Sequence, residues 1–341
     1  MNSPTIERRI PKQTNDMPYH IYDAEANVLS GKLQRPIQQE IEPQSPLHLQ
    51  DRRGGHFTRV TEDFSLEGFI SYKRGETRVS GSLGVKTPGW VTLSTSILEG
   101  LNVFDVITAD RVVSQVSTRH TYENGSENAH VPDVTFLGTH FKNLALNGIA
   151  VKPILDLSIC SKRPSGEKPG QKPDDKPRAN VADVPYVTDL AFLTAARKQV
   201  ETILKCDALP VTVREEYDSR LTTIEALSSP AKVGEPCSEA KHVTCSLVES
   251  IQIKDINGTK IPGLHVIGNL LIIPDFGTVA LAEIEVGVEL DDNPESRRST
   301  DTRYSQLNNY FRTTMLKMQL GCIGHGTVSA GSTKSNGLTR P

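Results

Sequence analysis

The sequence is poor in aromatic residues and has no long block of one charge. Phe, Trp and Tyr make up 5% of the 341 residues, with a single tryptophan, Trp90. Proteins that stack sugars or single-stranded bases rely on exposed rings, so both partner classes are disfavoured, although Trp90 and Tyr72 could still form a small platform. The net charge is −3 and no basic stripe is present, so we expect no nucleic acid partner. We expect an unknown protein or a small ligand instead.

Long hydrophobic segments are also missing. The most apolar stretch, Leu264 to Val288, is interrupted by Pro274, Asp275 and Glu283, which rules it out as a membrane span. The first twenty residues contain no apolar run of seven or more, so no signal peptide is expected. We therefore expect a soluble cytoplasmic protein, or alternatively one exported by an unmarked route.

The cysteines form neither a C-x-x-C pair nor a zinc-binding spacing. We expect five reduced thiols, with a Cys237–Cys245 disulfide as an alternative in an exported protein. Cys322 and His325 lie three residues apart, but the members of a Cys–His catalytic site usually come from separate elements. The sequence also lacks a G-x-S-x-G, an H-E-x-x-H and a phosphate-binding loop. We expect no cofactor.

The residues that are present predict a mainly β fold. Residues 69–83 are interpreted as a hairpin, and Val-rich segments at 90–97 and 103–120 as strands. The pair Asn147-Gly148 lies between two apolar runs, and this dipeptide is typical of a tight hairpin turn. A second such pair, Asn257-Gly258, follows later in the chain.

A helical insertion interrupts this β pattern. Residues 161–183 are rich in proline and lysine and are interpreted as a solvated linker. Residues 184–229 show two apolar repeats of helical period around Pro210, which predicts a helical hairpin. The β pattern then resumes.

We therefore predict sandwich-like or barrel-like antiparallel sheets with an inserted α-helical hairpin, with a β-solenoid-like fold as the alternative. The expected domain organisation is listed in chain order: a disordered tail at 1–17, a single β domain formed by 18–160 plus 240–322, the insertion between its two parts, and a flexible tail at 323–341. Segment 264–290 is expected to pack against 90–160, because two isolated strands are rarely stable.

The segment 278–290 alternates between apolar and acidic residues, as a half-buried strand does. Its inner row is predicted as Ala280, Ala282, Ile284, Val286 and Val288. Its outer row holds three carboxylates, Glu283, Glu285 and Glu289. Paired carboxylates can act as acid and base, but three on one strand face more often form a solvated surface.

Residues 98–157 contain the runs LEGLNVFDVITADRVVSQVST and VTFLGTHFKNLALNGIAV. Together these runs resemble bacterial β-rich proteins of the choice-of-anchor P type. The resemblance implies a bacterial cell-surface or secreted setting without a defined activity. The rest of the chain suggests an uncharacterised bacterial family.

Histidines and aspartates in the central β region are the candidate metal ligands. Imidazole and carboxylate groups together could bind zinc or a similar ion. The residues to test first are Asp110, His120 and His140, while His130 and Asp105 lie nearby in the sequence. Their spacing matches no known ligand motif, so surface and strand histidines are the alternative.

Two functional hypotheses follow. The leading one is a non-enzymatic β-rich binding or structural protein of unknown ligand, with a relation to a bacterial surface as one option. The alternative is an enzyme with a metal or acid/base site assembled from distant strand residues. Asp110 and Arg111, which neighbour each other in a strand, would supply a pocket charge under the second hypothesis and a satisfied ion pair or an edge position under the first.

Overall fold

The structure is a computed structural model. The residues it describes are 19–84, 89–121, 131–164, 184–235, 237, 239–253, 261–290, 307–321 and 325–340. The expected disordered tail at 1–17, most of the expected linker at 161–183, and the Asn257-Gly258 turn lie outside them. His130 and Cys322 also lie outside the described residues.

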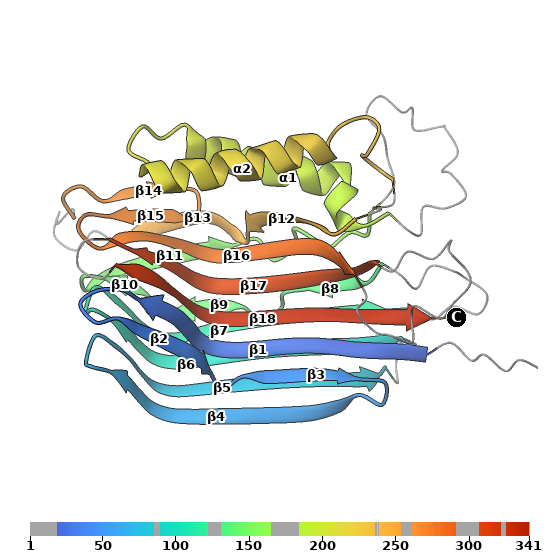
Figure 1. Cartoon of the computed structure of the whole chain (residues 1–341), viewed down its shortest axis with the longest axis horizontal. Helices are drawn as coiled ribbons and strands as arrows, with labels where there is room; N and C mark the ends of the chain where they lie inside the picture. The colour runs from blue at the N-terminus through green and yellow to red at the C-terminus, as the bar shows by residue number, and fades with distance from the viewer. Residues whose placement is uncertain are drawn as a thin grey trace, which may run out of the picture.

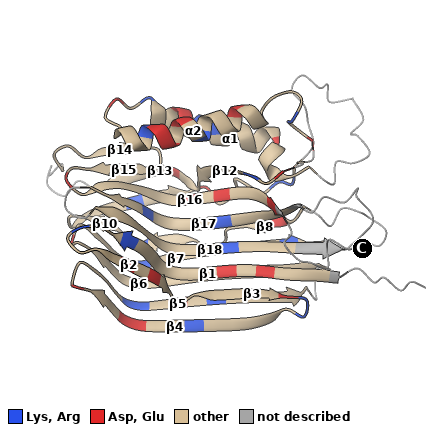
Figure 2. Ribbon diagram, in the orientation of Figure 1, with Lys and Arg blue, Asp and Glu red and all other residues tan. Residues whose placement is uncertain are grey.

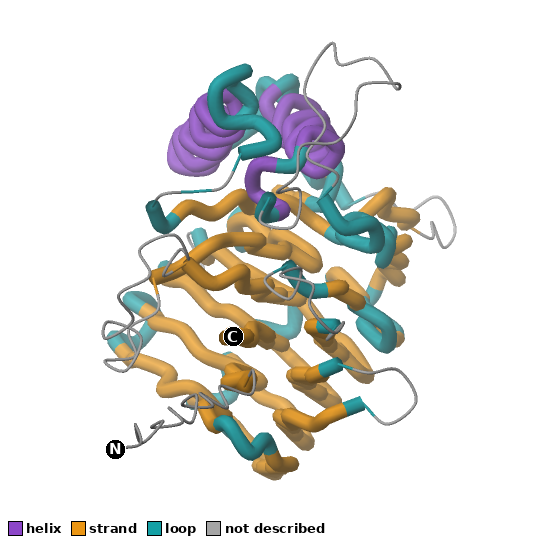
Figure 3. Tube along the Cα trace, turned by 90° about the vertical axis from the view of Figure 1, so that its right-hand side faces the viewer, coloured by secondary structure: helices purple, strands orange, loops and turns teal. Residues whose placement is uncertain are grey.

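Two antiparallel sheets pack face to face and form a β-sandwich (Figure 1), which Figure 3 shows end-on. Sheet A contains β14 (His265–Ile267), β15 (Leu270–Ile273), β16 (Gly277–Leu290), β17 (Leu307–Leu320), β18 (Gly326–Arg340), β1 (Tyr19–Leu33) and β2 (Gln39–Gln44) in this order, with β12 (Lys241–Ser246) beside β16 and β3 (Leu47–Asp51) beside β1. Sheet B contains β13 (Val248–Ile253), β11 (Ile149–Leu155), β10 (Ala145–Leu146), β7 (Ile107–His120), β6 (Trp90–Val103), β5 (Ile70–Leu83) and β4 (Gly55–Leu66), with β8 (Asp133–Thr135) and β9 (His140–Lys142) beside β7. The sandwich-like form of the predicted mainly β fold is confirmed.

The predicted helical hairpin is also confirmed. A short 3₁₀ turn, η2 (Tyr186–Thr188), precedes α1 (Leu190–Leu204) and α2 (Val211–Leu227). Asp189 caps α1, because its side chain accepts a hydrogen bond from the Phe192 N–H at 3.0 Å. Both helices lie beyond β12, β14 and β15 at one end of the sandwich (Figures 1 and 3). No described helix combines the length and the apolar character needed to cross a membrane.

One hydrophobic core joins the two sheets and the helices. Val112 and Val116 of β7 belong to the same buried cluster as Ile284 and Val286 of β16. Val200 of α1 is part of it as well. Segment 264–290 therefore packs in one core with segment 90–160, as expected.

The expected flexible tail at 323–341 is wrong. Residues 326–340 form β18, which pairs with β17 on one side and with β1 on the other. Small polar residues give this strand no apolar alternation, and this composition led to the wrong prediction. Its Thr333 and Ser335 side chains are nevertheless buried.

Those hydroxyl groups meet partners from the facing sheet. Ser114 and Thr333 lie 2.7 Å apart through their Oγ and Oγ1 atoms, and Thr118 and Ser335 lie 2.9 Å apart. The Ser96 hydroxyl donates to the Asn27 carbonyl at 2.9 Å. Direct contacts between such short side chains bring the sheets closer together here than the roughly 10 Å that is usual for stacked sheets. Part of the sandwich interior is therefore a layer of paired hydroxyls.

A bend crosses each sheet at residues with a left-handed backbone. In sheet A these are Ala282 (φ 47°) and Gly331 (φ 67°), and in sheet B they are Asp63 (φ 52°) and Gly100 (φ 67°). None of the four has a partner in the strand register. The chain therefore changes its direction at these points, and the alternation of side chains shifts by one.

This shift corrects the predicted faces of β16. Ala280 and Glu283 line the same small cavity beneath α2, although their odd spacing would place them on opposite faces of a regular strand. Ala280 therefore points toward the helix and does not belong to the inner row, whereas Ile284, Val286 and Val288 are buried as predicted.

The sequence prediction of local turns is partly confirmed. Residues 70–83 form one strand, β5, so the predicted hairpin at 69–83 is wrong. The Asn147-Gly148 turn is present, because Leu146 pairs with Ile149 and both turn residues have positive φ, 46° and 77°.

Candidate functional site on the outer face of sheet A

The structure does not bring the three predicted metal ligands together. Asp110 is exposed and accepts a hydrogen bond from Asn143 at 2.7 Å, while His140 is exposed on β9. His120 is buried at the end of β7, ten residues beyond Asp110. Ten residues of extended strand span about 33 Å, so proximity in the sequence did not become proximity in space.

His120 belongs to an aromatic cluster inside the sandwich. The His20 ring lies 4.8 Å from the His120 ring and stacks at 5.3 Å on Trp90. Burial, reinforced by the nearby His120, lowers the pKa of His20 to about 2. Tyr72 is buried near the other end of β5, where it stacks on Phe64, so Trp90 and Tyr72 do not form the suggested platform.

The other predicted reactive groups have structural roles. Cys160, Cys206, Cys237 and Cys245 are free, so the alternative Cys237–Cys245 disulfide is not formed. Burial raises the pKa of Cys160 and Cys245, which keeps both sulfurs in the weakly nucleophilic thiol form. Arg111 forms an ion pair with Glu99 at 3.6 Å, in keeping with the satisfied-ion-pair interpretation.

The three glutamates of β16 do not form one solvated row. Glu283 is buried and lies 2.7 Å from Arg220 of α2. Glu285 accepts hydrogen bonds from Tyr310 at 2.8 Å and from Arg312 at 3.0 Å. Each carboxylate therefore has its own partners, and the expectation of a shared wet face is wrong for Glu283.

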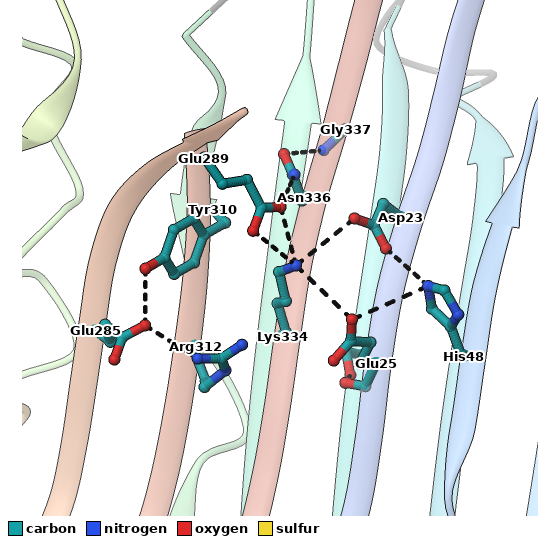
Figure 4. Close-up of polar contacts among 11 residues, drawn as sticks. Asp23, Glu25, His48, Glu285, Glu289, Tyr310, Arg312, Lys334, Asn336 and Gly337 are labelled. Carbon is teal, nitrogen blue, oxygen red and sulfur yellow. Dashed lines mark hydrogen bonds and ion pairs between the residues drawn. The ribbon is translucent and has the colours of Figure 1, made fainter. Parts of the chain in front are cut away.

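A polar cluster covers the outer face of β1, β3 and β18 (Figure 4). Asp23 and Glu25 point to one face of β1 because strand side chains alternate, while Ala24 between them is fully buried. His48 on β3 is the direct partner of Glu25 in the strand register. Its Nε2 lies 3.2 Å from Asp23 Oδ1 and 4.0 Å from Glu25 Oε1. Within the described residues, these three side chains form the group able to place His and carboxylate ligands around one ion, with ligand atoms within 4.8 Å of one another.

Lys334 on β18 connects this group to β16. Its Nζ lies 2.9 Å from Glu289 Oε1, but 3.8 Å from Asp23 and 3.7 Å from Glu25. Burial disfavours the ammonium form, yet Asp23, Glu289 and Glu25 together outweigh burial and raise the pKa of Lys334. Asn336 donates to the same Glu289 carboxylate at 2.9 Å. Lys334 is therefore held as a protonated cation.

A groove of about 380 Å³ runs beside this cluster. Its lining comes from β1, β2, β3, β17 and β18 and from the turn between β2 and β3. It carries Glu25, His48, Arg312 and Lys334 next to Pro43 and Pro46. Figure 2 shows acidic bands on β1 beside basic bands on β18 and β17. The groove thus presents both signs of charge on a rigid sheet.

Sequence reasoning missed this site, because it depends on which strands pair. One usable signal was available: Tyr22, Ala24 and Ala26 alternate with Asp23 and Glu25, which is typical of a strand with an acidic face. The position of His48 opposite Glu25 follows only from the pairing of β1 with β3.

Fold and site together define a β-sandwich with helices at one end and a polar groove on one outer face. The chain belongs to the family described as a domain of unknown function (DUF8256), whose family model matches residues 20–287. The matched range ends within β16, before β17 and β18. No curated protein matches the chain.

Proposed function

We propose that this protein is a non-enzymatic binding protein whose ligand site is the groove beside β1, β3 and β18. The groove carries the proposal: its volume of about 380 Å³ lies within the usual range of about 300–1,000 Å³ for small-molecule sites. Glu25 offers a carboxylate, while Arg312 and Lys334 offer cations. A small polar ligand with both charge signs, such as an amino acid or a short peptide, fits this lining best.

The chemistry of the neighbouring groups supports binding over turnover. The raised pKa of Lys334 keeps its amine protonated, so it has no free lone pair to act as a base or a nucleophile. The thiols of Cys160 and Cys245 are buried and protonated. The alternative, an enzyme with a site made of Asp110, His120 and His140, has no supporting geometry, because these residues lie apart.

The setting at a bacterial surface is part of the proposal. It is supported by the resemblance of residues 98–157 to bacterial β-rich proteins of the choice-of-anchor P type. These residues include β6, β7 and β11 of sheet B. The groove lies on the other sheet, sheet A, and in the proposed surface setting its outer face would bind the ligand.

Calorimetric titration of the full chain with a panel of amino acids and di- and tripeptides tests the proposal. Arg312→Ala should weaken any binding observed, because it removes a cation from the groove. Arg197→Ala is the matched control, since Arg197 forms an exposed ion pair on α1 outside the groove. Binding that Arg312→Ala leaves unchanged, or steady turnover in a parallel hydrolase panel, would overturn the proposal.

A further inference from the structure

Asp23, Glu25 and His48 have the arrangement that a β-sheet uses to hold a metal ion. Two ligands at positions i and i+2 of β1 share a face, and the third lies on the neighbouring strand opposite one of them. Two atoms bound tetrahedrally to one Zn²⁺ at about 2.0–2.1 Å lie about 3.3–3.4 Å apart. The distance of 3.2 Å from Asp23 Oδ1 to His48 Nε2 already matches this spacing.

The third ligand needs only a small adjustment. Glu25 Oε1 lies 4.0 Å from His48 Nε2, and its side chain is 44% exposed and able to rotate. His48 is 53% exposed, so an ion can reach the cluster from solvent. Three protein ligands leave a fourth coordination position open, and two of them, Glu25 and His48, also line the groove.

The charge balance of the cluster favours a divalent cation. Asp23, Glu25 and Glu289 contribute three negative charges, and Lys334 contributes one positive charge, which leaves −2. Lys334 makes its close contact with Glu289, whereas its distances to Asp23 and Glu25 exceed hydrogen-bond range. Asp23 and Glu25 therefore keep ligand capacity that the ammonium does not use.

We propose that Asp23, Glu25 and His48 form a binding site for a divalent metal ion of the zinc class. The histidine selects this class, because imidazole with carboxylates suits zinc and similar ions, whereas calcium and magnesium prefer oxygen ligands alone. The site goes beyond the proposed function and does not depend on it. A groove ligand could bind without the metal, and the metal could bind without a groove ligand.

Titration of the chelator-treated full chain with zinc chloride, in excess magnesium, tests the site. We expect one zinc ion per chain in the wild type and a loss of at least about tenfold in affinity in His48→Ala. His140→Ala is the matched control, because His140 is also exposed but lies outside the cluster. Thermal melts without metal show whether each variant is folded.

A second variant separates a metal site from an ionic network. Lys334→Met removes a positive charge next to the ligands, so zinc affinity should rise by about tenfold. Absence of zinc binding in both the wild type and Lys334→Met would overturn the proposal. Binding that His48→Ala leaves unchanged would overturn it as well, and neither result would bear on amino-acid or peptide binding in the groove.

Discussion

The guanidinium of Arg220 on α2 lies 2.7 Å from the carboxylate of Glu283 on β16, and both side chains are largely buried. Arg220 also contacts Glu216 at 2.6 Å and lies over the Tyr217 ring at 4.5 Å. Lys317 of β17 reaches Glu216 at 2.8 Å. This network of ion pairs links α2 of the helical insertion to β16 and β17 of sheet A.

Arg220→Met should destabilise the protein by about 3–5 kcal/mol, because it removes the close partner of the buried Glu283 carboxylate and leaves it only the longer contact with Lys317 at 3.6 Å. The double variant Arg220→Met with Glu283→Leu should recover much of that loss, since no buried charge then remains unpaired. Urea unfolding measures both changes. Arg197→Met is the control: its ion pair with Glu201 is exposed, and its loss should cost far less stability than the loss of Arg220.

The hydroxyl pairs between the sheets predict a coupling energy. Thr333→Val should cost about 1–3 kcal/mol, because it leaves the buried Ser114 hydroxyl without its 2.7 Å partner. Combining it with Ser114→Ala should cost less than the sum of the two single changes. A double-mutant cycle from denaturant unfolding measures this difference, and strict additivity would contradict direct hydrogen bonding between the sheets.

The buried His20 predicts a loss of stability in acid. Its pKa is about 2 in the folded protein and about 6.5 when unfolded, so the unfolded chain binds an extra proton between these values. Stability should therefore be unaffected by this group above pH 6.5 and fall below it by about 1.4 kcal/mol per pH unit. Carboxylates contribute little to the pH dependence of stability between pH 6.5 and 5, so histidines dominate it there and a variant that lacks His20 isolates the contribution of this one.

The check is urea unfolding across that pH window. His20→Gln should show a shallower dependence on pH than the wild type. His140→Gln, at an exposed position, should keep the dependence of the wild type. Equal slopes in all three proteins would mean that His20 is not held neutral.

The bend in sheet A predicts that a side chain at position 331 destabilises the protein. A Cβ added there would lie 3.1 Å from the Met315 side chain, on a backbone with φ +67°. Gly331→Ala should cost more than the 1–2 kcal/mol expected for a left-handed alanine alone. Gly68 is the matched control, because its φ is +74° and nothing lies within 4 Å of an added Cβ. Thermal unfolding of both variants separates steric crowding from backbone strain.

The strand content and the helical hairpin could be predicted because they depend on local patterns. Asn147-Gly148 formed the expected turn since both residues tolerate positive φ. The faces of β16 could not be predicted in full. Ala282 introduces a shift of one residue, and α2 covers Glu283, and neither effect is visible in the alternation of 278–290.

The candidate site could not be predicted for a different reason. Asp23 and His48 lie close together because β1 pairs with β3, although β2 comes between these strands in the sequence. Lys334 lies beside them because β18, about 300 residues later, pairs with the other edge of β1. Sequence reasoning chose Asp110, His120 and His140 because they lie close together along the chain. An extended strand separates such residues, whereas sheet pairing brings distant ones together.

The central position of β18 has a consequence for the nascent chain. β1 pairs on one side with a strand that leaves the ribosome roughly 300 residues later, about 15–60 s at a synthesis rate of about 5–20 residues per second. Until then β1 has no pairing partner along that edge. β17 also lacks the strand that separates it from β1 in the finished sheet. Sheet A therefore cannot be completed before β18 has been synthesised, and the growing chain depends on protection from wrong strand pairing during the whole of that interval.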